Sequence, residues 1–497
     1  MMMSLAAVLA VAAAAPAGGE LPDLLSIDWK RLPDLVDAQG YEGSGGFQNS
    51  DGGWISHDSV VTAFGHGPGH AGKPLTEFLS SAYLLNVTAA SASSCLGGHA
   101  GGAACKGWQR LPDAPVSGRQ DVASSVIGGA VYIVGGFSYS APYSYSDFLR
   151  LGPEAAAAAG GGGEGGGGSA DTPAASTWSW QRLPSFPYPL SMHAVASIGS
   201  KFYVQGGACY NRKAFFSFTD CTGGTPGLGK RLYVFDTAKP TSGWTRLPDN
   251  PGPPRANAAM SSVNGSLYVL GGMTFVPKTG KVAGKTTAMT LVDNWKYDTA
   301  AQKWSRLPDF PIASCNFQTN GPQTSFQDRY IILIGGYQYG NTYYANASTG
   351  PSFGVASRLC PTGVDPTTPR GAGCLKCGVQ MPNITYMGPR PSGSDWSREY
   401  NSDVFVFDTR TSTFGRARGT SHADRGLIPT GEGCSAAFPI NNNLPQANVL
   451  GASIFAIGGE CNDRIIPGTS VSPSSPYSRD YGHYPPLALY GQITALP

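Results

Sequence analysis

The residues best suited to chemistry stand at, or just before, the start of a strand that recurs along the chain. Asp121 and His193 hold this position in successive repeats, and a carboxylate beside an imidazole could act as an acid–base pair or as two metal ligands. Two ligands do not make a metal site, so we expect no metal and assign no catalytic residue. The ligand-binding candidates are Gln48, Arg119, Asp121, His193, Arg255, Asn257, Asn316 and Glu432, with Cys434 at the same aligned position.

Two interpretations of these polar side chains are open. If the recurring strands line a channel, the side chains form a ring at its mouth, where they could bind a hydroxylated ligand or a peptide loop. Alternatively, they only form hydrogen bonds with one another and with water inside a wet channel.

The elements that must position these residues are strands of a repeat. A phrase of Trp, two polar residues, Leu and Pro indicates a half-buried strand that the proline ends. It occurs five times, at Trp29–Pro33, Trp108–Pro112, Trp180–Pro184, Trp244–Pro248 and Trp304–Pro308.

Two further strands belong to each repeat. One is an alternating apolar strand that ends in two glycines, which allow positive φ and a close approach of neighbouring strands. The other is a strand followed by an Asp-Thr pair, whose aspartates are Asp236, Asp298 and Asp408. The glycine doublets lie at 135–136, 206–207, 271–272, 335–336 and 458–459.

Four strands, a glycine doublet and a Trp on the last strand together resemble the Kelch repeat. The resemblance implies an all-β fold, a six-bladed Kelch-type β-propeller. A Trp strand at 27–33 has no blade before it, and the last repeat lacks one after its third strand at 487–493. We therefore predict that the N-terminal strand completes the last blade and closes the ring.

The remaining repeat units are irregular. We expect a single propeller domain at 18–497, with loop insertions at about 152–177 and 337–400. The fifth Trp phrase has decayed to Phe414–Arg418. The first strand of the fifth repeat is predicted to begin at Cys315, and that of the sixth to lie near Cys434–Pro439.

The chain has the features of a secreted glycoprotein. Residues 1–17 are typical of a signal peptide, with an apolar run followed by Ala15-Pro16-Ala17. Its 34 Lys+Arg and 32 Asp+Glu nearly balance, which gives no electrostatic reason to expect nucleic acid as a partner, and no later stretch predicts membrane insertion. The glycosylation sequons lie at Asn86, Asn264, Asn346 and Asn383.

An even count of ten cysteines in an exported chain favours disulfides. From the expected strand positions we predict the bonds Cys434–Cys461, Cys209–Cys221 and Cys95–Cys105. Cys315 is expected to bond with Cys360, Cys374 or Cys377, and the other two with each other.

The function predicted from these features is the binding of a protein or carbohydrate ligand at one rim of the channel, without a cofactor. A carbohydrate-active enzyme is the alternative. Sialic-acid mutarotases are similar exported six-bladed Kelch propellers, and galactose oxidase-like copper enzymes share a propeller of this kind. The Tyr-rich segment at Tyr337, Tyr339, Tyr343 and Tyr344 invites the second comparison, but no residue here can be assigned the copper-binding roles.

Overall fold

The computed structural model is built almost entirely of β-strands. In the residues it describes, the only helices are two short 3-10 turns, Leu228–Lys230 and Pro240–Ser242, and no helix is long and apolar enough to span a membrane. The described residues are 22–32, 51–56, 58–67, 77–87, 108–154, 178–211, 215–219, 227–277, 286–291, 293–309, 324–334, 337–338, 341–343, 357–358, 399–400, 404–419, 446–457 and 488–497.

Six antiparallel four-stranded units make up the fold, as the repeat predicted. Blade 1 contains β2 (Asp51–Ser56), β3 (Ser59–Ala63), β6 (Ala82–Asn86) and β7 (Trp108–Leu111). Blade 2 contains β8 (Gln120–Ile127), β9 (Ala130–Phe137), β10 (Phe148–Pro153) and β11 (Trp178–Leu183). Blade 3 contains β12 (Ala194–Ile198), β13 (Lys201–Gln205), β16 (Leu232–Asp236) and β17 (Trp244–Leu247).

The other three blades complete the ring. Blade 4 contains β18 (Ala259–Val263), β19 (Ser266–Leu270), β22 (Asn294–Asp298) and β23 (Lys303–Leu307). Blade 5 contains β24 (Ser325–Phe326), β25 (Tyr330–Leu333), β30 (Phe405–Asp408) and β31 (Thr413–Gly419). Blade 6 contains β32 (Gln446–Leu450), β33 (Ser453–Ile457), β34 (Ala488–Ala495) and β1 (Asp23–Arg31).

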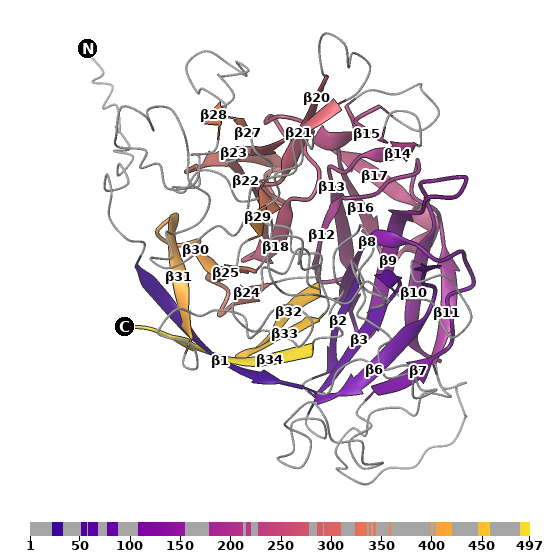
Figure 1. Cartoon of the computed structure of the whole chain (residues 1–497), viewed down its shortest axis with the longest axis horizontal. Coiled ribbons are helices and arrows are strands. Elements are labelled where there is room, and N and C mark those ends of the chain that lie inside the picture. The colour runs from indigo at the N-terminus through magenta and orange to yellow at the C-terminus, as the bar shows by residue number, and fades with distance from the viewer. Residues whose placement is uncertain are drawn as a thin grey trace, which may run out of the picture.

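The blades close into a ring (Figure 1). Each first strand contacts the first strand of the next blade, in the order β2, β8, β12, β18, β24, β32 and back to β2. A cluster of buried apolar side chains fills each of the six interfaces between neighbouring blades. The core is therefore a circle of sandwich-like interfaces rather than one central mass.

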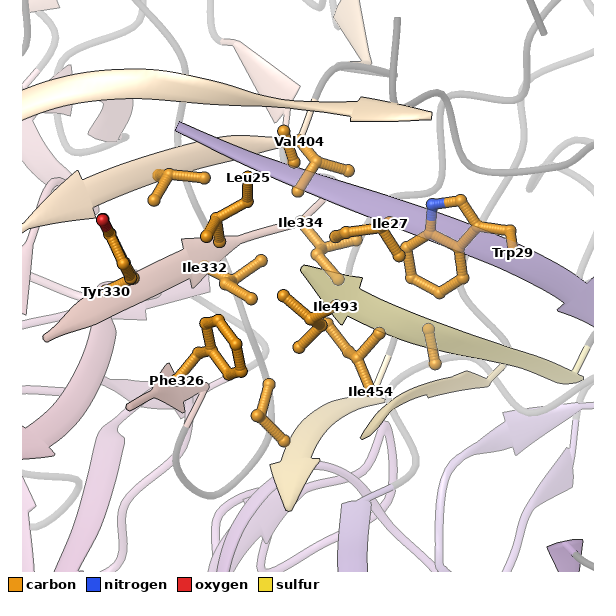
Figure 2. Packing of buried hydrophobic residues seen from close by; sticks show 14 of the residues in the cluster. Leu25, Ile27, Trp29, Phe326, Tyr330, Ile332, Ile334, Val404, Ile454 and Ile493 are labelled. Carbon is orange, nitrogen blue, oxygen red and sulfur yellow. The ribbon is translucent and has the colours of Figure 1, made fainter. Parts of the chain in front are cut away.

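The predicted closure by the N-terminal strand is confirmed. β1 is antiparallel to β34, with Ile27 opposite Ile493 and Arg31 opposite Leu489. β1 also pairs in parallel with β31 of blade 5, which joins blades 5 and 6 into one eight-stranded sheet. Figure 2 shows the cluster at this interface, where Trp29 and Ile27 lie near Ile493 and Ile454.

The predicted first strands of blades 5 and 6 were wrong. They are β24 and β32, which pair with β25 and β33, rather than strands beginning at Cys315 and Cys434. The predicted segments begin 20 and 24 residues before their glycine doublets, whereas β32 begins 12 residues before Gly458, as β12 and β18 do before Gly206 and Gly271. The observed strands reach the second strand through a tight turn.

Short strands outside the blades come from the loops. β4 (His66–Gly67) pairs with β5 (Glu77–Phe78), and β14 (Cys209–Asn211) with β15 (Phe215–Ser217). β20 (Met273–Pro277) and β21 (Thr286–Leu291) join β27 (Asn341–Tyr343) and β28 (Ser357–Arg358) in a further sheet. β26 (Tyr337–Gln338) pairs with β29 (Glu399–Tyr400), so the insertion at 337–400 contributes strands of its own.

The Trp phrase links neighbouring blades through its first and last residues. In blades 2, 3 and 4 the indole Nε1 of the phrase Trp donates to the carbonyl of the Pro that ends the phrase of the preceding blade. The donor–acceptor distances are 2.7 Å for Trp180 to Pro112, 3.0 Å for Trp244 to Pro184 and 2.8 Å for Trp304 to Pro248. The phrases of blades 2 and 3 thus each donate a hydrogen bond to the preceding blade through the Trp and accept one from the following blade through the Pro.

One break in this series lies between blades 5 and 6. The decayed phrase of blade 5 has Arg418 in place of proline, and within the described part of the chain the Nε1 of Trp29 has no hydrogen-bond partner. The parallel pairing of β1 with β31 holds the two blades together at this position instead.

His193 precedes β12 and packs between the glycine doublets of blades 2 and 3. A Cβ atom on Gly135 would lie 2.8 Å from its ring carbon Cε1, and a Cβ atom on Gly207 would lie 2.7 Å from its Cβ. Burial lowers the pKa of His193 to about 3, so the imidazole is neutral in the folded protein at neutral pH.

We expect Trp304→Phe to lower the free energy of unfolding by about 1 kcal/mol more than Trp29→Phe. Both indoles are buried, at 8% and 5% exposed, so the two substitutions remove similar apolar area. Only Trp304 gives up a hydrogen bond and leaves a proline carbonyl without its donor. Guanidinium denaturation measures both values, and equal losses would contradict the role assigned to the Trp–Pro bond.

His193 should make stability depend on pH. Its folded pKa lies below the unfolded value, so the unfolded state binds more protons and stability is lost as pH falls below about 6.5 toward 3. Between pH 7 and pH 5 this loss amounts to about 2 kcal/mol. His193→Gln should remove that share of the pH dependence in denaturant titrations. An unchanged slope in the variant would show that His193 is not the responsible group.

Candidate functional site

The loops that join the second and third strands all lie on one rim, because the blades are antiparallel and arranged in the same direction. The first strands begin at this rim as well, so most of the polar candidates lie there. In blades 1 to 4 these loops are at 64–81, 138–147, 206–231 and 271–293.

Arg119 and Arg255 hold equivalent positions and make equivalent bonds. Arg119 donates to Asp147 at 2.8 Å and to the carbonyl of Gly135 at 3.3 Å. Arg255 donates to Asp293 at 2.5 Å and to the carbonyl of Gly271 at 2.8 Å. The two arginines are 2% and 0% exposed. Each therefore fastens a rim loop to the first glycine of its own doublet.

The surroundings of Arg119 extend this connection. Its guanidinium carbon lies 3.7 Å from the centroid of the Tyr145 ring, and Asp147 also accepts a 3.1 Å bond from Arg182. Burial lowers the pKa of Arg119, against the opposing effect of Asp147. The Tyr145 hydroxyl lies 2.8 Å from that of Ser138, so the network continues into the loop of blade 2.

Asp121 and Asn257 are buried at a left-handed bulge, with φ of 51° in both. The equivalent residue in blade 3 is Met192, with φ of 56°, and not His193 as the sequence alignment had it. In blade 2 the strand pairing joins Val122 to Gly135, the first glycine of the doublet, and skips Asp121. In blade 3, extending the pairing of β12 with β13 by one residue places His193 opposite Gly206, the first glycine of that doublet. His193 therefore corresponds to Val122 and not to Asp121. Asp and Asn favour left-handed backbone, so polarity at this position reflects the bulge as much as a ligand.

The remaining candidates cannot all be placed. Three binding candidates and two sequons lie outside the described residues, namely Gln48, Asn316, Glu432, Asn346 and Asn383. All cysteines except Cys209 lie outside them as well. Cys209 is buried and disulfide-bonded, but its bond to Cys221 stays a prediction. Asn86 ends β6, and Asn264 occupies the exposed turn between β18 and β19, where its Nδ2 donates to the carbonyl of Asp328 at 3.0 Å.

A continuous set of aromatic rings lies on the same rim and is the candidate functional site. We call it the aromatic arc, and it crosses the loops of blades 1 to 4. Its members are Phe78 from blade 1, Phe137, Tyr139 and Tyr143 from blade 2, Tyr210, Phe216 and Phe218 from blade 3, and Phe275 from blade 4.

Neighbouring rings of the arc are in contact. The centroids of Phe78 and Tyr139 lie 5.0 Å apart, those of Tyr139 and Tyr210 5.9 Å, and those of Tyr210 and Phe216 5.0 Å. Phe216 and Phe275 are stacked at 5.8 Å. Tyr139 is 49% exposed, which is uncommon for a large apolar side chain, while Phe137 and Tyr210 are buried members of the arc that pack against it.

Hydrogen bonds fix the loops that carry the arc. The buried Ser144 hydroxyl of blade 2 accepts from the amide of Tyr210 at 2.9 Å and lies 3.2 Å from its carbonyl. Ser191 and Ala208 exchange backbone bonds of 2.9 and 2.8 Å, and Ala256 and Met273 do the same. The arc is thus a preorganised surface rather than a set of independent loops.

The sequence contains a signal for the arc. An aromatic residue stands three positions after the second glycine of four doublets, as Tyr139, Tyr210, Phe275 and Tyr339. The first three are arc members, and Tyr339 lies outside the described residues. Within the part of the chain that the structure covers, no group of three His, Cys, Asp or Glu could hold a metal ion.

Comparisons with known proteins match parts of the chain. A family model described as Kelch motif matches residues 254–311, which contain all four strands of blade 4. The N-acetylneuraminate epimerase of Yersinia enterocolitica is 35% identical over 118 residues, 23% of this chain and 27% of that protein. The N-acetylneuraminate epimerase 1 of Escherichia coli is 31% identical over 94 residues, 18% of this chain and 23% of that protein.

A longer match is the Kelch-like protein terF of Aspergillus terreus, 23% identical over 316 residues, 62% of this chain and 58% of that protein. The chain therefore spans less than two thirds of the length of each curated relative. Among solved structures, the one titled "Structure of YjhT" has a TM-score of 0.45 and 15% identity, with 94% of this chain and 99% of that one covered.

The matched motif in blade 4 recurs as a four-stranded sheet in each of the six blades. Its Trp makes the same bond to a proline of the preceding blade as Trp244 in blade 3, and its Arg255 bonds to the first doublet glycine as Arg119 does in blade 2. The chain therefore folds as a six-bladed Kelch-type β-propeller.

Proposed function

We propose that this chain is a secreted Kelch-repeat propeller that binds carbohydrate on the rim formed by the loops between second and third strands. The observation that carries the proposal is the aromatic arc, because rings from four consecutive blades are in contact along one rim and Tyr139 among them is exposed to solvent. Aromatic side chains with a polar handle dominate recognition surfaces, since they bury much area at a low cost in conformational entropy.

Two further observations support the proposal. Two of the partial relatives are named for a reaction of a sugar, N-acetylneuraminate. The arginines Arg119 and Arg255, just before the first strands, are buried in loop-fastening bonds, so they position the rim on which Tyr139 faces solvent. The signal-like leader and the disulfide-bonded Cys209 support export, since disulfides persist in oxidising compartments.

A sugar epimerase is the second candidate, and the named relatives favour it. Exchange spectroscopy by NMR on N-acetylneuraminate with catalytic amounts of the protein tests it directly. Faster interconversion of epimers than in buffer would support an enzyme. An unchanged exchange rate would exclude this substrate, and carbohydrate binding would then be the function to pursue.

We expect the purified protein to bind members of a glycan array, and Tyr139→Ala to weaken that binding about tenfold, as for a residue that dominates an interface. Leu450→Ala is the matched control, because Leu450 is a similarly exposed apolar residue, 41% against 49%, at the end of β32 on the opposite rim.

The proposal fails if no glycan is bound, or if a protein ligand alone is found. It also fails if Leu450→Ala and Tyr139→Ala weaken binding equally, since the rim would then have no special role. Melting temperatures of the variants show whether either substitution disturbs the fold.

A further inference from the structure

Tyr139 is the most open member of the aromatic arc. It is 49% exposed, whereas Phe137 and Tyr210 are buried and the other five members are half-buried. Residues 140–142, which follow it at the tip of the blade 2 loop, are exposed as well and have small side chains. The surface that the arc offers to a ligand is therefore concentrated at one ring.

Three rings of the arc pack against Tyr139. Its centroid lies 5.0 Å from that of Phe78 in blade 1, at an interplanar angle of 80°. It lies 5.9 Å from the centroid of Phe137 in its own blade and 5.9 Å from that of Tyr210 in blade 3. Because these contacts come from three consecutive blades, they hold the exposed ring in one orientation.

The backbone around Tyr139 is fixed as well. The amide of Ser138 donates to the carbonyl of Tyr143 at 2.9 Å, and the amide of Tyr143 donates to the carbonyl of Ser140 at 2.9 Å. The Ser138 hydroxyl donates to the Ser140 carbonyl at 3.0 Å and lies 2.8 Å from the Tyr145 hydroxyl. Since the loop is closed by its own hydrogen bonds, binding a ligand on the ring costs little conformational entropy.

We propose that this site contacts one sugar unit at a time, through the exposed ring of Tyr139. The inference rests on the proposed carbohydrate binding and narrows it from the whole rim to the place where the loops of blades 1 to 3 meet. A phenol ring and a pyranose ring are of similar size, so one unit covers the exposed part of Tyr139. Further units of a chain would lie over rings that are already buried or half-buried, and they would remove little more apolar surface from water.

The experiment measures binding of the full mature protein in solution by saturation-transfer NMR titration. The probes are glucose, galactose, mannose, N-acetylglucosamine and N-acetylneuraminate, each as the free monosaccharide and as the terminal unit of longer glycans. For every sugar that binds, we expect the monosaccharide and the longer glycans to have affinities within about threefold of one another, because contacts outside the central one add little.

Substitutions separate the ring from its surroundings. Tyr139→Phe keeps the ring and should leave the affinity within about threefold of the wild type, whereas Tyr139→Leu keeps an apolar side chain without the ring and should weaken binding about tenfold. Phe275→Leu is the matched control within the arc, since Phe275 is half-buried in the loop of blade 4. This variant and Leu450→Ala should both bind as the wild type does.

The outcomes distinguish this inference from the proposed function. A tenfold gain in affinity with chain length, or a loss in Phe275→Leu equal to that in Tyr139→Leu, would overturn the single-unit contact while carbohydrate binding stands. Wild-type affinity in Tyr139→Leu would overturn the assignment to this ring. Binding of no sugar, free or in a longer glycan, would overturn both, and a protein bound in its place would do the same. Melting temperatures show that the variants are folded.

Discussion

At the end of the second strand in blades 1, 2 and 3, the amide of one glycine donates to the backbone of the next blade. Gly65, which follows Phe64, donates to the carbonyl of Arg119 at 2.9 Å, and the second doublet glycines Gly136 and Gly207 donate to the carbonyls of Leu190 and Arg255 at 2.8 and 2.9 Å. Their φ angles are 108°, 97° and 90°. A side chain would be strained there and, on Gly136 or Gly207, would approach its neighbours to less than 3 Å. The blades can pack this closely only where the backbone lacks a Cβ atom.

A second set of contacts holds the outer part of the ring together. The doublets join blades near the channel, and the Trp–Pro bonds join them at the fourth strands. Between blades 5 and 6 the proline is replaced by Arg418, and the chain uses a parallel strand pairing at that place. The N-terminal strand therefore has two partners, because it must complete one blade and also replace a missing link to the other.

Much of the fold could be predicted from the sequence, because doublets and Trp phrases recur at fixed places in the blade. The pairing of the strand at Trp29 with the last strand followed from a missing element at one end and a spare one at the other. The first strands of blades 5 and 6 were misplaced because they were aligned on a polar residue or cysteine and not on their distance before the doublet. The alignment of His193 with Asp121 failed for a related reason: the bulge shifts the register by one residue, and polarity alone does not reveal backbone conformation.

The candidate site depends on the doublets in turn. Arg119 and Arg255 bond to the carbonyl of the first glycine, while the second glycine fixes the distance to the next blade. Tyr139, Tyr210 and Phe275 follow three residues later, so their spacing around the rim is set by the spacing of the blades. The polar residues at the channel mouth then serve as the frame, and the aromatic residues as the surface. A change of ligand would require only new residues three positions beyond each doublet, with the ring itself unaltered.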